Sequence, residues 1–201
     1  MNQTIRNEWA VSQTLPTPLL TASDLHSHLR LFTEGSPPSH PDDEYVEALI
    51  AAATQAAEDY TQRAFVQRTV TLKRADLKDK LYLPVYPVVS VDSITYIDTE
   101  GDPQVLTGYR FADTLPAYIE IDKPPEVKDE GLPVTITVTA GYPSETSPVS
   151  GDQVPQVIKH AIRLMVGHFY ENREAVNIGN ITSKIPLAYE YLLHPHRVIG
   201  V

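Results

Sequence analysis

The sequence predicts an α+β fold in which a bundle of two long helices and shorter ones is joined to a small antiparallel β region. Residues 43–63 and 155–174 keep apolar side chains at helical spacing. Between them, residues 65–142 alternate β-forming and polar residues and contain turn signals, so the β region is inserted between the two helices. With extended termini, this gives an N-terminal arm over 1–18, an α+β domain over 19–175 and a C-terminal segment over 176–201.

The N-terminal part of the chain predicts an extended arm followed by a short helix. Residues 1–18 are mainly polar and hold the only tryptophan, Trp9. Thr21 and Asp24 have the spacing of a capping box, in which each residue binds the backbone of the other. A loop follows over residues 34–41, because three prolines and one glycine cannot continue a helix.

The second helix is expected to begin at three consecutive carboxylates, Asp42, Asp43 and Glu44, and to end near Arg63. Negative charge at a helix N-terminus is favoured by the helix dipole. Apolar residues repeat at the helical period through Tyr60, and several alanines let a neighbouring element approach closely. A cation site is the alternative interpretation of the carboxylates, but helix capping explains them more simply.

The β region contains several short segments with strand patterns. The expected strands are residues 66–72, 89–97, 104–106, 118–121 and 134–139. The last of them alternates Val and Ile with Thr, which places its apolar side chains on one face. The second and third are joined by turn residues 98–102 and form the pattern of a β-hairpin. Residues 144–153 are expected to link the β region to the next helix.

The helix expected over residues 154–175 is apolar over most of its circumference. Pro155 opens it, since the N–H that proline lacks is not needed at the first helical position. Such a helix must be covered on several sides. We expect the helix over 43–63 to cover one side and another copy of the protein to supply further cover. A last helix is expected over residues 186–193, ended by Pro195.

Charge is distributed unevenly along the chain, whose formal net charge is −10. Residues 1–150 hold 22 acidic and 11 basic side chains, whereas residues 151–201 hold 4 acidic and 5 basic ones. An acidic body repels phosphate, so a duplex-binding surface is not expected, and residues 1–150 are expected to form an acidic channel or outer face. No signal peptide or membrane span is expected. The absence of cysteine excludes disulfides and thiolate chemistry.

No residue spacing predicts a catalytic, metal or cofactor site. His160 and His168 are two helical turns apart, which is too far for one metal ion to bridge easily, and no Gly-rich phosphate loop occurs. Lys159 and Arg163 are like charges one turn apart. They fit either a solvated face or a contact with a carboxylate-rich partner, and the sequence leaves both interpretations open.

Several stretches, in order along residues 18–201, resemble the head–tail connector, or adaptor, proteins of long-tailed bacteriophages and prophages. The strongest match is His-Phe-Tyr-Glu-Asn-Arg-Glu-Ala at residues 168–175. Residues 43–65 are similar to the second helix of that family, which often has Gly where Gln62 stands. Residues 83–101 resemble its signature hairpin, and residues 192–198 its C-terminal motif.

The resemblance implies a structural virion protein of the neck, made in the host cytoplasm, and not an enzyme. Such adaptors form a ring, usually of twelve copies, beneath the portal protein. The ring extends the DNA channel without binding DNA specifically and presents a surface to the next neck or tail-completion protein. A small α+β hydrolase and a host binding module remain the alternative functions.

The C-terminal segment from about Ile178 is expected to dock onto the portal, because it is rich in apolar and aromatic residues and no longer acidic. The alternative is that it folds back over the long helix. With the polar residues of that helix, the expected contacts to the portal or a neighbouring subunit are Lys159, Arg163, Tyr170, Arg173, Ile185, Leu187, Tyr189, Tyr191, Leu192, Leu193, His196, Arg197 and Val198.

Overall fold

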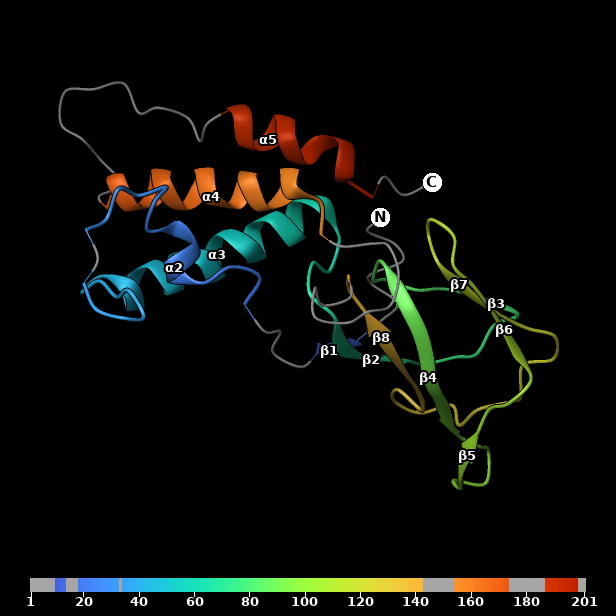
Figure 1. Cartoon of the computed structure of the whole chain (residues 1–201). Helices are drawn as coiled ribbons and strands as arrows, with labels where there is room; N and C mark the ends of the chain where they lie inside the picture. The colour runs from blue at the N-terminus through green and yellow to red at the C-terminus, as the bar shows by residue number, and fades with distance from the viewer. Residues whose placement is uncertain (1–9, 14–17, 33, 143–153, 174–186, 199–201) are drawn as a thin grey trace. The chain divides into compact units, whose positions relative to one another are not determined.

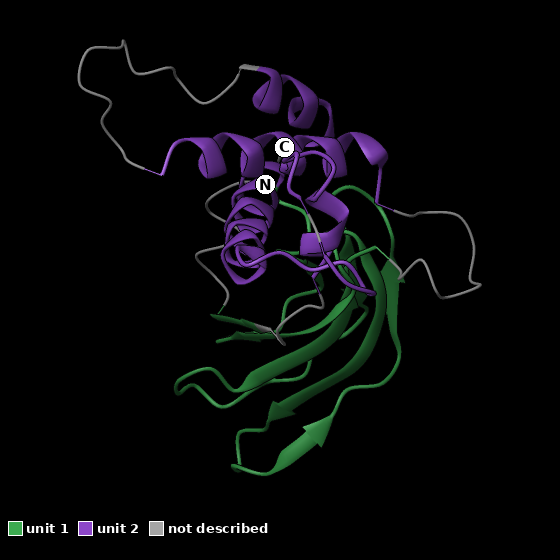
Figure 2. Ribbon diagram, turned by 60° about the vertical axis from the view of Figure 1, so that its left-hand side comes forward, with its two compact units in different colours: residues 1–16, 62–153, 198–201 green, residues 17–61, 154–197 purple. Residues whose placement is uncertain are grey.

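The computed structural model describes residues 10–13, 18–32, 34–142, 154–173 and 187–198 (Figure 1). The chain divides into two compact units, shown in different colours in Figure 2. The helical unit comprises residues 17–61 and 154–197, and the β unit comprises residues 1–16, 62–153 and 198–201. The predicted α+β class is confirmed. In the described ranges, no helix combines the length and the apolar character that crossing a membrane requires.

The helical unit is built around two helices that come from opposite ends of the inserted β segment. Its elements are α2 (Ala22–Leu25), α3 (Asp43–Thr61), α4 (Gln156–Glu171), α5 (Leu187–Leu193) and the 3-10 helix η1 (His194–His196). The predicted packing of α3 on α4 is confirmed, and α5 packs on both. The buried positions of the pair follow the helical period: Val46, Ile50, Ala53, Ala57 and Thr61 on α3, and Ile158, Lys159, Ala161, Ile162, Met165 and Val166 on α4.

The expectation of two long helices is correct only for α3, which has 19 residues, whereas α4 has 16. α4 ends at Glu171, because Asn172 leaves the helical conformation with φ −117° and ψ 69°. The backbone N–H of Asn172 donates to the His168 carbonyl oxygen at 3.1 Å, and its side-chain amide donates to the same oxygen at 2.8 Å. Asn172 thus provides the hydrogen bonds that the His168 carbonyl oxygen, near the C-terminal end of α4, would receive from the next turn of a longer helix.

Two antiparallel sheets form the β unit. Their strands are β1 (Ala10–Gln13), β2 (Arg68–Arg74), β3 (Lys80–Tyr82), β4 (Val88–Ile97), β5 (Pro103–Val105), β6 (Tyr109–Ala112), β7 (Tyr118–Ile121) and β8 (Val134–Ala140). One sheet has the order β1-β2-β8-β4-β5 and the other the order β3-β7-β6. A single hydrophobic core receives side chains from both sheets, including Val70, Ile94 and Ile136 from the first and Leu81 and Ile119 from the second.

All five predicted strands are present, and the predicted hairpin is confirmed as the β4–β5 pair. Its turn is closed by Asp98, whose side chain accepts hydrogen bonds from the backbone N–H groups of Glu100 and Asp102 and from the Gln104 amide. β1, β3 and β6 were not predicted, and each has only three or four residues. β1 lies within the expected arm and pairs with β2.

Gln62 and Gly141 are two of the described positions whose backbone conformations favour glycine. Gln62, directly after α3, has φ +59°, which is the left-handed conformation that commonly ends a helix. Gly141, directly after β8, has φ +111°, and a Cβ atom there would lie 2.3 Å from the carbonyl oxygen of Val66. A side chain at position 141 would therefore disrupt the junction between β8 and the residues before β2.

Candidate functional site

The predicted contact residues of α4 also interact within their own chain. Lys159 is buried, with 8% of its surface exposed, and Arg163 is half-buried. Their positive charges act on Asp24 at the start of α2. The backbone N–H of Thr21 is the main cause that holds the pKa of Asp24 below its usual value, and Arg163 and Lys159 add to it. Asp24 of the same chain is thus one carboxylate that lies near both cations.

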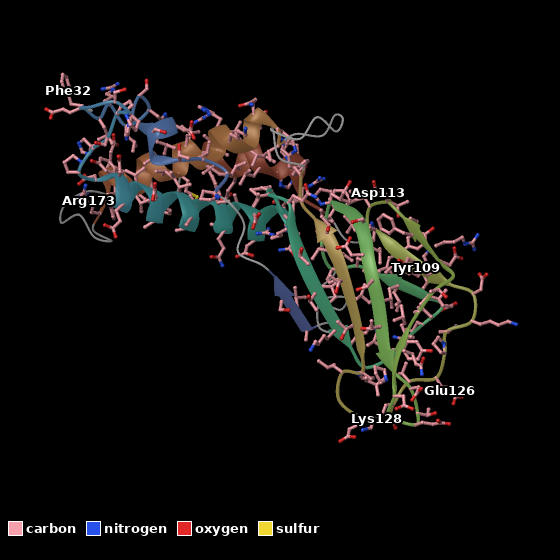
Figure 3. The ribbon with its side chains drawn as sticks, turned by 60° about the horizontal axis from the view of Figure 1, so that its bottom comes forward. Phe32, Tyr109, Asp113, Glu126, Lys128 and Arg173 are labelled. Carbon is pink, nitrogen blue, oxygen red and sulfur yellow. The ribbon has the colours of Figure 1, made fainter. Side chains whose placement is uncertain are left out.

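Asp42 joins the start of α3 to the end of α4. Its Oδ2 accepts a hydrogen bond from the Tyr170 hydroxyl at 2.6 Å and one from the Arg173 guanidinium at 2.7 Å. The same guanidinium lies over the rings of Tyr45 and Tyr170, at 4.7 and 5.0 Å from their centroids. Figure 3 labels Arg173 at this end of the helical unit. We call Asp42, Tyr45, Tyr170 and Arg173 the Asp42 clamp.

The clamp perturbs the pKa values of its members in the direction that its geometry requires. The Tyr170 hydroxyl, and after it the Arg173 guanidinium, hold the pKa of Asp42 below its usual value. In return, the Asp42 carboxylate raises the pKa of Tyr170 and that of Arg173. The strongest sequence match, residues 168–175, thus supplies Arg173 to an internal ion pair with Asp42 and Tyr170 to a hydrogen bond with the same carboxylate.

A second polar contact holds the loop before α3. The His26 Nε2 lies 2.6 Å from the Asp43 Oδ1, and His26 is buried. The backbone N–H of His40 donates to the other oxygen of Asp43 at 2.9 Å. This N–H is the main cause that lowers the pKa of Asp43, followed by the His26 side chain. Asp42 and Asp43, interpreted from sequence as helix capping alone, therefore also bind side chains distant in sequence.

The C-terminal residues that were expected to contact the portal or a neighbouring subunit fall into three groups. Tyr189, Leu193 and Val198 are buried within the chain. Leu192 and His196 are half-buried, whereas Tyr191 and Arg197 are exposed. Ile185 and the side chain of Leu187 lie outside the described residues. The segment packs back on the helices through α5, as the alternative interpretation of the sequence had it.

An open hollow lies beside α5 on the helical unit. It is lined by Tyr60, Ala188, Glu190, Tyr191, His194 and Pro195. Tyr191 is 80% exposed, which is unusual for a large aromatic side chain. The Arg197 guanidinium lies 5.1 Å from the centroid of the Tyr60 ring. Burial raises the pKa of the neighbouring Tyr189 to about 12.

The described residues offer no cluster of side chains for a metal ion. Among them, no group of three or more His, Asp or Glu side chains could hold a metal ion. The hollow brings His194 and Glu190 to one surface, but its remaining lining is aromatic or apolar. An exposed aromatic, an arginine and an apolar depression are the composition of a protein-binding surface.

A family model described as "Head completion protein" matches residues 30–186 of the 201 residues. The chain belongs to the head completion protein family. Membership of this structural family confirms the predicted head–tail connector and rules against the hydrolase and the host binding module. No curated protein that was compared matches the chain.

Solved structures with the same fold come from gene transfer agent (GTA) particles. A chain in "Neck of empty GTA particle computed with C6 symmetry" has a TM-score of 0.74 and 23% identity, over 96% of this chain and 97% of that one. A chain in "Virion of native gene transfer agent (GTA) particle" gives 0.74 and 23%, over 95% and 96%. A chain in "Neck of native GTA particle computed with C12 symmetry" gives 0.66 and 20%, over 96% and 97%.

Proposed function

We propose that this head completion protein forms a ring, expected to have twelve copies, beneath the portal in the neck of a phage-like particle. The observation that carries the proposal is the family match over residues 30–186. Fold similarity to chains of neck structures computed with C6 and C12 symmetry supports a ring. One heterologous contact repeated around an axis closes such a ring by rotation.

The ring extends the DNA channel and lets DNA pass without specific binding. The supporting observation is the exposure of carboxylates in both units. Glu44, Glu47 and Asp59 are exposed on α3, and Glu100 and Asp102 are exposed at the β4–β5 turn. Phosphate is repelled by such surfaces, so an acidic lining lowers non-specific binding of DNA in transit.

The portal is the head-side partner, and the next neck or tail-completion protein is the tail-side partner. We assign portal docking to the C-terminal segment 176–201, with domain 19–175 as the ring body and residues 1–18 as an arm. The exposed pair Tyr191 and Arg197 is the best-supported part of the docking surface, because the buried Tyr189 and Leu193 already pack within the helical unit.

Electron microscopy of portal rings mixed with the chain tests this function. The expected result is an added ring of density on one face of the portal, with portal rings alone as the control. Symmetry analysis of that density counts the copies. Bare portal rings at saturating concentrations of a folded chain would refute the proposal. Truncation after Ala175 is a poor variant for this test, since it removes the buried Leu193.

A further inference from the structure

The five-stranded sheet of the β unit has two open edges, β1 and β5 (Figure 1). An edge strand offers unpaired backbone N–H and C=O groups to another chain, and proteins commonly block such edges with charged side chains. All four edge strands of the two sheets have three or four residues, so length does not distinguish them. Charge does, since β3 carries Lys80 and β6 carries Arg110, whereas β1 and β5 carry no charged residue.

Both uncharged edges also expose an apolar side chain. Val11 on β1 is 48% exposed, and Val105 on β5 is 68% exposed. Pro103 is the first residue of β5 and removes only its own N–H from that strand. The two edges therefore combine the backbone groups and the apolar side chains on which the addition of a strand from another chain depends.

Charged residues of opposite sign stand beside the two edges. Lys73 on β2 is exposed and is the register partner of Ala10 on β1, whose side chain is a single methyl group and leaves space for Lys73 to extend past the edge. Asp102, directly before β5, is exposed as well. The chain has a formal net charge of −10, so two copies repel each other as whole molecules. A contact between two uncharged edges, with a cation near one and an anion near the other, avoids this repulsion locally.

We propose that β1 of one copy pairs with β5 of the next copy, so that the five-stranded sheet continues from copy to copy around the ring. The inference rests on the proposed ring and names the contact that builds it. The two edges are different surfaces, and a contact between different surfaces repeats head to tail until rotation closes it. Successive strands of the sheet are antiparallel, so β1 and β5 run in the same direction and pair in parallel between copies. Backbone hydrogen bonds supply the affinity, and Lys73 opposite Asp102 favours this orientation.

A lysine substitution at either edge tests the contact by electron microscopy of portal rings mixed with the chain. Val11→Lys and Val105→Lys should each require at least about tenfold more chain to form the added ring, because a charged edge blocks strand addition. Val89→Lys is the matched control, since Val89 is 50% exposed but lies on β4, an interior strand of the same sheet. It should form rings as the unchanged chain does, and all three variants should keep the melting temperature of the unchanged chain.

Charge reversal provides a second test that leaves both edge strands unchanged. Lys73→Glu should weaken ring formation, and the same chain with Asp102→Lys added should recover it, because every copy contributes both edges. If the unchanged chain forms rings and Val11→Lys and Val105→Lys form them equally well, the inference is wrong while the proposed function stands. Equal loss of rings in Val89→Lys would also refute the assignment of the contact to the edges. If the unchanged chain forms no ring on the portal, the proposed function fails, and this inference with it.

Discussion

A substitution at Leu193 tests whether α5 belongs to the core of the helical unit. Its side chain is fully buried, so Leu193→Ala leaves a cavity between α5 and the helices beneath it. Substitutions of this kind in well-packed cores reduce the free energy of unfolding by about 2–5 kcal/mol. With about 3 kcal/mol lost and about 2–4 °C per kcal/mol for a chain of this size, the melting temperature should fall by about 6–12 °C.

Tyr191→Ala is the matched control, because it lies two residues earlier on the same helix and is 80% exposed. It should change the free energy of unfolding by no more than about 0.5 kcal/mol. Both variants are measured by thermal and urea denaturation followed by circular dichroism. Equal melting temperatures for the two variants would refute the assignment of α5 to the core.

Hydrogen exchange of backbone amides shows how the stability is lost in Leu193→Ala. If α5 unfolds together with the rest of the helical unit, amides of α3 and α4 exchange faster as well. If α5 is released alone, the acceleration is confined to residues 187–193. The second result, with a small change in melting temperature, would mean that α5 is a separately docked element.

Four further outcomes are expected. Met165→Asp should lower the free energy of unfolding by about 3 kcal/mol or more, since Met165 is 6% exposed and a buried carboxylate would be unpaired; an unchanged melting temperature would contradict the packing of α3 on α4. Gln62→Gly should raise the free energy of unfolding, measured by urea denaturation, by about 1 kcal/mol, because glycine adopts the φ of +59° at this position without strain. A decrease would show that the backbone of Gln62 is not strained. The pKa of Asp42 is lowered in the folded chain, so the ionised carboxylate stabilises the fold above about pH 4, and this effect is lost as the pH falls through the folded pKa. In Asp42→Asn, the melting temperature should therefore fall less between neutral and acidic pH than it does in the unchanged chain. Duplex DNA should bind the whole chain more weakly than about 1 µM at physiological salt, as a fluorescence titration would show, and tighter binding would argue against an acidic channel.

Local signals in the sequence predicted local structure well. The capping box of Thr21 and Asp24 is present, with the Thr21 N–H donating to the Asp24 carboxylate at 2.8 Å. The β4–β5 hairpin was predictable for the same reason, since its turn is closed by residues within six positions of Asp98. Such features depend on neighbouring residues and need no knowledge of the tertiary fold.

The clamp around Asp42 could not be predicted from spacing. Tyr170 lies 128 residues after Asp42 and Arg173 lies 131 residues after it, so only the fold brings them together. Helix capping explained Asp42 without a side-chain partner, and Tyr170 and Arg173 were predicted to contact the portal or a neighbouring subunit. Long-range ion pairs of this kind leave no periodic pattern in one sequence.

The burial of side chains on α5 could have been predicted from their spacing in the sequence, which the prediction of contact residues did not use. Tyr189 and Leu193 are four residues apart and so lie on one face of a helix, whereas Tyr191 lies on the other. The structure buries the first two and exposes the third. Reading the segment by helical period, rather than by its apolar content, separates its core residues from its surface residues.

The connection between the ends of the inserted β segment has a consequence for folding. Its first and last strands, β2 and β8, are hydrogen-bonded neighbours, and the Gln67 N–H donates to the Tyr142 carbonyl oxygen at 3.1 Å. Once these strands have paired, the ends of the β segment are held close together. The connection between α3 and α4 then behaves as a short loop and not as a loop of all residues 62–153.

Closing a loop shortened about fivefold saves roughly 1.5 kcal/mol of chain entropy. Pairing of α3 with α4 is non-local in sequence and would be slow in an unfolded chain, but it becomes nearly local after the strands have assembled. During synthesis, the β segment leaves the ribosome before α4 does. The order of the sequence therefore favours folding of the strands first, and the two halves of the helical bundle meet when α4 has been made.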